Sequence, residues 1–250
     1  LLSRGLGDVY KRQVNGYKSI LRNLSEHFKE ILINDITPLD IQKEINDYSV
    51  SRSPKTVRNA HGFISAVLGM FRPEFNISTT LPQKRKNNEY IPSDEDVKRI
   101  LEYAKGTRYE IPLLLATLGL RRSEICALTL DDLNGNILTI NKALVLNKDK
   151  EFVIKSTKTA DGTRQIYLPD YLAELIRKNG SIYDGFPGSI LRFLNRAQDA
   201  LDIKHFRLHA LRHYYASMSH SLGIPDSYIM QAGGWKSDGT LKRVYRHAMD

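Results

Sequence analysis

Between residues 117 and 124 the chain reads Thr-Leu-Gly-Leu-Arg-Arg-Ser-Glu. A glycine between two leucines is typical of a tight turn, and Arg121 follows this turn directly. A guanidinium just after a turn is well presented to a phosphate, because its planar fork donates two parallel hydrogen bonds. On its own such a stretch more often marks a helix start with solvated arginines, so its meaning depends on the sequence around it.

The segments on both sides of this turn have apolar residues at helical spacing. Residues 111–117 are typical of a buried helix, and residues 122–128 resume a helical pattern. Upstream, Ser93 precedes three acidic residues, which is typical of a capped helix N-terminus. We therefore expect a domain over 93–250, preceded by a polar and basic linker over 81–92.

The character of the sequence changes after residue 137. β-Branched residues alternate there with Asn-Lys-Asp-Lys and Ala-Asp-Gly turn signals, which predicts two or three antiparallel strands. Helical spacing then returns, and we expect helices over 171–178, 189–201, 208–221 and 225–232. The fold class predicted for this part of the chain is mainly α with a small antiparallel β-sheet.

Residues 14–80 are predicted to form a small all-helical unit. Apolar residues recur at helical spacing from Tyr17 onward. Two further helix starts are indicated by Thr37-Pro38 and Ser53-Pro54, each an N-cap residue followed by a proline at the first helical position. Residues 1–13 begin with Leu rather than Met, show neither helical nor strand periodicity and lack the apolar core of a signal peptide. Because the run resembles adapter-derived translations that are fused to gene fragments, we expect a non-native leader, and the alternative is a disordered native tail.

The composition is that of an ordinary globular chain. Of 250 residues, 41% are apolar and 26% are charged, and 37 Lys and Arg against 28 Asp and Glu give a net charge of +9. This balance favours an anionic partner such as nucleic acid. The single cysteine, Cys126, excludes a disulfide within the chain and a multi-cysteine zinc site. The longest apolar stretch is far shorter than the ~20 residues that span a bilayer.

Two further motifs follow the turn at 117–124. A Thr-Lys-Thr sequence centred on Lys158 precedes the Ala-Asp-Gly turn, and Lys155 lies three residues upstream. His209 and Arg212 are three residues apart, which places them on one face of the predicted helix. His209 and His213 have the spacing of a zinc-binding helix, but the glutamate of His-Glu-x-x-His is missing, so we expect no metal site there.

The tail of the chain contains one more motif. Gly234-Trp235 is typical of a turn that presents the indole, and Tyr245 follows ten residues later with basic residues on both sides. Because the chain has 13 tyrosines, a single tyrosine is more often structural than catalytic. The order of the motifs along the chain therefore carries more information than any one of them.

This order resembles that of the tyrosine recombinase (phage integrase) family. Residues 117–124 are similar to the first box of the family, 208–213 to the second, and 234–247 to the end of its catalytic domain. The resemblance covers residues 93–250, and the helical unit over 14–80 is similar to the family's DNA-binding core-binding domain. The fold that it implies is a tyrosine recombinase catalytic domain preceded by a small all-helical core-binding domain.

The resemblance implies catalytic roles for Arg121, Lys158, His209, Arg212, Trp235 and Tyr245. The two arginines would bind the scissile phosphate, Lys158 would be the general acid, His209 would assist proton transfer, and Tyr245 would be the nucleophile. Trp235 stands where most relatives have histidine, and its indole N–H can donate a hydrogen bond but cannot accept a proton. Lys155 stays an alternative to Lys158, because the sequence does not fix the hairpin register.

The resemblance implies an enzyme that cuts and rejoins DNA at specific sites through a 3′-phosphotyrosyl intermediate, for integration or excision of a phage or mobile element. No cofactor and no metal are expected, since two arginines can stabilise the charge that a metal would otherwise stabilise. The implied partners are double-stranded DNA and further copies of the chain, as a tetramer on DNA, with no membrane and a cytoplasmic location. The alternative is a non-catalytic DNA-binding protein in which residues 208–232 form a helix–turn–helix-like module.

Overall fold

The computed structural model describes residues 14–83, 90–147, 150–156, 163–239 and 241–242. The chain divides into two compact units, with the division between residues 87 and 88. Residues 1–13, Lys158 and Tyr245, on which the sequence raised expectations, lie outside the described residues.

The first unit is helical over its described residues. Residues 14–23 form a helix, followed by α2 (Glu26–Glu30), α3 (Pro38–Ser49) and α4 (Pro54–Phe71). The start signals at Thr37 and Ser53 act as predicted, because each side chain accepts a hydrogen bond from the backbone three residues later. The core of this unit comes mainly from the buried faces of α3 and α4: Ile41, Ile45, Tyr48, Val57, Ile64 and Leu68.

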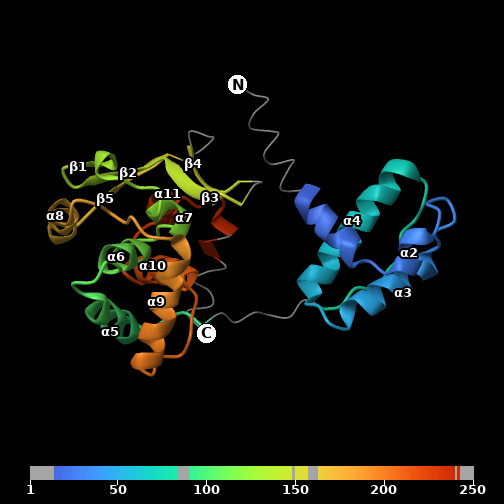
Figure 1. Cartoon of the computed structure of the whole chain (residues 1–250), viewed down its shortest axis with the longest axis horizontal. Coiled ribbons are helices and arrows are strands. Elements are labelled where there is room, and N and C mark those ends of the chain that lie inside the picture. The colour runs from blue at the N-terminus through green and yellow to red at the C-terminus, as the bar shows by residue number, and fades with distance from the viewer. Residues whose placement is uncertain (1–13, 84–89, 148–149, 157–162, 240, 243–250) are drawn as a thin grey trace. The chain divides into compact units, whose positions relative to one another are not determined.

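The second unit is mainly helical (Figure 1). Its helices are α5 (Asp94–Ala104), α6 (Glu110–Thr117), α7 (Arg122–Ile125), α8 (Asp170–Asn179), α9 (Pro187–Ala200), α10 (Leu208–Ser221) and α11 (Asp226–Gly233), with a 3-10 turn over Leu130–Asp132. Ser93 caps α5 in a capping box, as predicted. The helix predicted over 122–128 is shorter, because the chain turns after Ile125 and Thr129 begins the 3-10 turn with a capping box of its own.

The strands of the second unit form two small antiparallel sheets. One has the order β1-β2-β5, from β1 (Leu133–Asn134), β2 (Ile137–Ile140) and β5 (Arg164–Tyr167), and the other pairs β3 (Lys142–Leu146) with β4 (Phe152–Ser156). The expectation of two or three strands is therefore wrong in number, since the described residues contain five. Two features account for the difference. A break at Asn141 divides one β-branched run into two strands with different partners, and β1 lies before residue 137, where the predicted strands begin.

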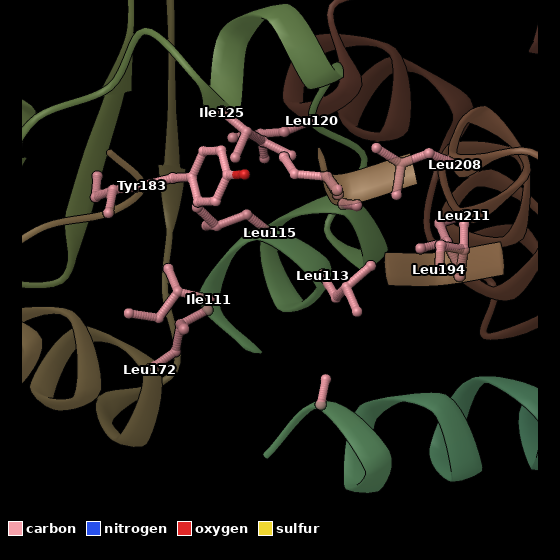
Figure 2. Close-up of a cluster of buried hydrophobic side chains, with 14 of the residues drawn as sticks. Ile111, Leu113, Leu115, Leu120, Ile125, Leu172, Tyr183, Leu194, Leu208 and Leu211 are labelled. Atoms are coloured by element: carbon pink, nitrogen blue, oxygen red, sulfur yellow. The ribbon is translucent and has the colours of Figure 1, made fainter. Parts of the chain in front are cut away.

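The core of the second unit surrounds α6, which is apolar on nearly all sides. Figure 2 shows Ile111, Leu113 and Leu115 of α6 among apolar side chains from the rest of the unit, of which the labelled ones are Leu120, Ile125, Leu172, Tyr183, Leu194, Leu208 and Leu211. A helix with apolar residues all round must be buried. Because α10 packs against α6, the turn that follows α6 lies beside the middle of α10. Within the described ranges, none of the helices has the length and apolar character needed to span a membrane.

Candidate active site

The C-terminal end of α11 gathers three arginines from three distant segments of the chain. The bonds are Arg164 Nε to Ala232 O (2.7 Å), Arg212 Nη1 to Gly233 O, and Arg121 Nη2 to Gly234 O (3.0 Å). The last carbonyls of a helix lack partners within the helix and carry partial negative charge, so they attract cations. Three consecutive carbonyls thereby hold three guanidinium groups at one place.

Arg212 is the most deeply buried of the three, with 2% of its surface exposed. Its Nη1 also donates to Gly119 O, in the turn after α6, and its Cζ lies 3.8 Å from the ring centroid of Trp235. Burial, and next the positive charge of Arg121, lowers the pKa of Arg212 to about 9, so the group stays charged at neutral pH. Its Nη2 is buried and has no hydrogen-bond partner among the described residues, which leaves a donor for a ligand.

Arg121 lies at the N-terminus of α7 and stays partly open to solvent. Its side chain is 41% exposed, and its Nη1 donates to Glu124 Oε1 at 2.7 Å. The backbone N–H of Arg121 donates to the other oxygen of the same carboxylate at 2.8 Å. Glu124 therefore fixes both the backbone and the side chain of an arginine that an external anion can still reach.

Glu124 and Arg164 form a buried ion pair beneath Arg121. Their side chains are 6% and 5% exposed, and the two Nη atoms of Arg164 bond the two carboxylate oxygens at 3.1 and 2.8 Å. Burial by itself would raise the pKa of Glu124, but the hydrogen bonds and charge of Arg164, together with Arg121, hold it below its usual value. Arg121 and Arg164 both bond this carboxylate, and its charge also acts on Arg212 without a direct bond. The cluster therefore has three guanidinium groups for one carboxylate, which leaves a local excess of positive charge.

Two glycines allow the aromatic residues to approach the cluster. A Cβ on Gly233 would lie 1.8 Å from Cζ3 of Trp235, so the indole can occupy this place only beside a glycine. Tyr215 stacks parallel to Trp235, with ring centroids 6.5 Å apart. Gly119 has a φ of +87°, and a Cβ there would lie 2.8 Å from the Tyr215 ring. These contacts fix the position of Trp235 against Arg212.

His209 lies three residues before Arg212 on α10, but it is exposed whereas Arg212 is buried. Its ring contacts that of His213 edge to face, with centroids 4.9 Å apart. Over the part of the chain that the structure describes, no group of three or more His, Cys, Asp or Glu residues could hold a metal ion.

Of the predicted site residues, the structure brings Arg121, Arg212 and Trp235 together at the end of α11. Lys158 and Tyr245 lie outside the described residues, and Lys155 is a half-buried residue of β4, opposite Ala143 of β3. The choice between the two lysines therefore stays open.

Sequence reasoning missed the structural importance of Arg164. A signal for it is present in the strand pattern, because Arg164 and Ile166 are buried while the alternate residues of β5 are exposed. Residues two apart on a strand face the same side of the sheet, so an arginine two residues before a buried isoleucine also points toward the interior.

Comparisons with known proteins agree with this architecture. The family model for the phage integrase N-terminal SAM-like domain matches residues 9–49. A protein of Caldanaerobacter subterraneus subsp. tengcongensis described as tyrosine recombinase XerC-like is 20% identical over 284 residues, which cover 93% of this chain and 72% of the relative.

Solved structures extend the likeness to both units. The Tn1549 transposon integrase in complex with transposon right end DNA has a TM-score of 0.75 at 17% identity, over 94% of this chain and 89% of that one. A lambda integrase dimer bound to a core site has a TM-score of 0.69 at 18% identity, over 94% of this chain and 88% of that one. The predicted fold class, mainly helical with small antiparallel sheets after a helical N-terminal unit, is confirmed.

Proposed function

We propose that this chain, a member of the tyrosine recombinase family, is a site-specific DNA recombinase that cuts and rejoins strands through a 3′-phosphotyrosyl intermediate. The observation that carries the proposal is the placement of Arg121 and Arg212 at one end of α11, within a cluster that has more guanidinium than carboxylate groups. Arg212 keeps a buried donor without a protein partner among the described residues, and Arg121 is partly exposed. Such a pair suits a phosphodiester, which is anionic and accepts several hydrogen bonds.

The two arginines would act mainly on the transition state. Attack on a phosphodiester places additional charge on the non-bridging oxygens, and fixed donors facing that charge commonly supply the largest catalytic contribution. Both guanidinium groups are held by backbone carbonyls before any substrate binds, so little reorganisation is needed. The indole N–H of Trp235 would add a further donor to a phosphate oxygen.

Tyr245 would be the nucleophile. A phenol of pKa ~10 is a weak nucleophile at neutral pH and must lose its proton as it attacks, which nearby positive charge favours. The bond from its oxygen to phosphorus forms while the bond to the 5′-oxygen breaks. The leaving oxygen takes a proton from Lys158, or alternatively Lys155, with His209 assisting. Because the phosphotyrosyl bond retains the bond energy, a 5′-hydroxyl can attack it and rejoin the strand without a nucleotide cofactor.

The domain organisation would follow that of the family. Residues 14–80 would be the core-binding domain, 81–92 the linker and 93–250 the catalytic domain, which together would bind double-stranded DNA. One solved relative is a lambda integrase tetramer bound to a Holliday junction, with a TM-score of 0.66. We infer that this chain likewise acts as a tetramer on DNA in the cytoplasm, and that it integrates or excises a mobile element.

Covalent trapping on a randomised pool of DNA tests the chemistry and selects the DNA site in one step. The 250-residue chain is incubated with nicked duplexes that carry a randomised core, and adducts that survive SDS are recovered and sequenced. We expect an enriched core sequence from the wild type and no adduct from Tyr245→Phe. Tyr228→Phe is the matched control, since Tyr228 is an exposed tyrosine of α11.

Each outcome decides between the two functions. An adduct that persists in Tyr245→Phe would contradict the assignment of the nucleophile. Specific DNA binding without any adduct from the wild type would favour the non-catalytic DNA-binding alternative.

Arg121→Ala separates catalysis from binding. We expect it to abolish the adduct while the affinity for the selected duplex falls little, because many other phosphate contacts remain. Arg122→Ala is the control, because Arg122 is the next residue in the chain and is exposed. Equal losses of cleavage and binding in Arg121→Ala would show that Arg121 has a structural role instead.

A further inference from the structure

Arg164 is the third arginine at the end of α11, and its surroundings differ from those of the other two. It is the first residue of β5, pairs in register with Ile140 of β2, and has a side chain that is 5% exposed. A buried charge is destabilising unless it is paired and hydrogen-bonded. The partners of Arg164 therefore indicate why a guanidinium is present at this position.

Every nitrogen of the Arg164 guanidinium donates a hydrogen bond to another part of the protein. Nη1 and Nη2 bond the two oxygens of Glu124, and Nε bonds the Ala232 carbonyl at 2.7 Å. Arg121, in contrast, is 41% exposed, and Arg212 has a buried Nη2 with no described partner. Arg164 is thus poorly placed to receive a phosphate itself, and any influence on the reaction must pass through the groups that it holds.

These groups lie next to two of the candidate catalytic residues. Glu124 bonds both the backbone and the side chain of Arg121. Ala232 lies at the end of α11, three residues before Trp235. The backbone N–H of Trp235 donates to the carbonyl of Met230, also in α11, at 2.9 Å. The planar guanidinium of Arg164, on β5, therefore connects Glu124, which holds Arg121, to the end of α11, which holds the backbone of Trp235.

We propose that Arg164 is a positioning residue of the strand-cleavage site, which fixes α7 and the end of α11 to β5 so that Arg121 and Trp235 face one phosphate together. This inference rests on the proposed function of the site. It assigns no contact with DNA to Arg164, and it makes the planar fork of the side chain, rather than its charge alone, the required feature.

Arg164→Lys tests this requirement, because lysine keeps the charge but cannot form the two parallel bonds and the third bond together. A displacement of about 1 Å can cost about a hundredfold in rate. We expect the rate of adduct formation on the selected nicked duplex to fall by about that factor. The affinity for that duplex should change little, since the phosphate contacts remain. The control is Arg177→Lys, because Arg177 donates one bond to the Gly135 carbonyl at 2.9 Å on an exposed surface.

A second measurement does not depend on cleavage. Trp235 is the single tryptophan of the chain, so fluorescence excited at wavelengths that tyrosine hardly absorbs reports on this residue alone. Without DNA, and at a temperature at which circular dichroism shows the variant to be folded, Arg164→Lys should shift the emission to longer wavelength and increase quenching by acrylamide. Arg177→Lys should leave both unchanged.

A double-substitution cycle tests the route through Glu124. If Arg164 acts partly through this carboxylate, Arg164→Lys combined with Glu124→Gln should lose less activity than the product of the two single losses. Losses that multiply would contradict this route.

The remaining outcomes also decide the question. Wild-type cleavage and fluorescence in Arg164→Lys would overturn the proposal, and so would a loss of rate that only equals the unfolded fraction. If the wild type forms no adduct but the fluorescence of Arg164→Lys still shifts, the proposed function fails while the hold of Arg164 on Trp235 is supported.

Discussion

Arg212 lies against the face of Trp235, with its guanidinium carbon 3.8 Å from the ring centroid. Tyr215 stacks on the same indole with an interplanar angle of 3°. The contact covers one side of a buried cation whose pKa is lowered mainly by burial. Trp235 therefore has a structural role beside any contact with a phosphate, and substitutions can separate the two.

Trp235→Ala should destabilise the protein more than Trp235→Phe. Alanine removes the ring face that contacts Arg212, whereas phenylalanine keeps a smaller ring there, and a desolvated cation–ring contact contributes about 2 kcal/mol. We expect the free energy of unfolding to fall by about that amount for alanine and by less for phenylalanine. Urea unfolding followed by circular dichroism measures both, and equal losses would show that the contact with Arg212 adds no stability.

Gly119→Ala should cost more stability than Gly106→Ala. Both glycines have positive φ, +87° and +71°, so alanine at either position is strained by about 1–2 kcal/mol. A Cβ at Gly119 would also lie 2.8 Å from the Tyr215 ring, whereas at Gly106 no described heavy atom lies within 4 Å. We expect an additional loss of about 1–3 kcal/mol for Gly119→Ala in denaturant unfolding. Equal losses would indicate that Tyr215 moves away without cost.

Gly233→Ala should displace Trp235 from Arg212. The added Cβ would coincide with the indole, which must rotate away because the helix backbone at 233 cannot yield easily. We expect tryptophan fluorescence at longer wavelength and a loss of cleavage. Gly239→Ala is the control, since a Cβ there meets no described heavy atom within 4 Å. An unchanged emission spectrum in Gly233→Ala would contradict the packing of Trp235 on this glycine.

The parts of the fold that could be predicted from the sequence depend on local signals. The caps at Thr37, Ser53 and Ser93 involve a side chain and a backbone N–H only three residues apart, so the pattern and the structure coincide. Short motifs likewise indicate Arg121, Arg212 and Trp235, and the structure brings them together.

The parts that could not be predicted depend on contacts between distant segments. Strand β2 pairs with β5 rather than with β3, although β3 follows it directly in sequence. No local sequence pattern specifies this choice of partner. Arg164 bonds Glu124 and Ala232, which are 40 and 68 residues away in the chain. Strand alternation indicates that Arg164 points inward, but only the folded structure identifies its partners.

Glu124 should contribute a pH-dependent part of the stability. Its pKa in the folded protein is held below the usual 4.5, so the unfolded chain takes up this proton at higher pH than the folded chain does. The contribution is therefore complete above the usual pKa and is lost as the pH falls through the lower, folded value. The glutamine side chain in Glu124→Gln does not titrate, so this variant should lack the part of the acid-induced loss of stability that comes from Glu124.

We expect Glu124→Gln to be less stable than the wild type by about 3 kcal/mol at neutral pH, because it leaves Arg164 buried beside a neutral partner. The difference should shrink as the pH is lowered below the usual pKa of 4.5, where urea unfolding of both proteins can be compared. Glu102→Gln is the control, because the Glu102 side chain is 74% exposed and its pair with Lys105 lies at the surface, where ion pairs add little. A stability difference that stays constant down to the acid unfolding transition would show that the charge of Glu124 does not stabilise the cluster of arginines.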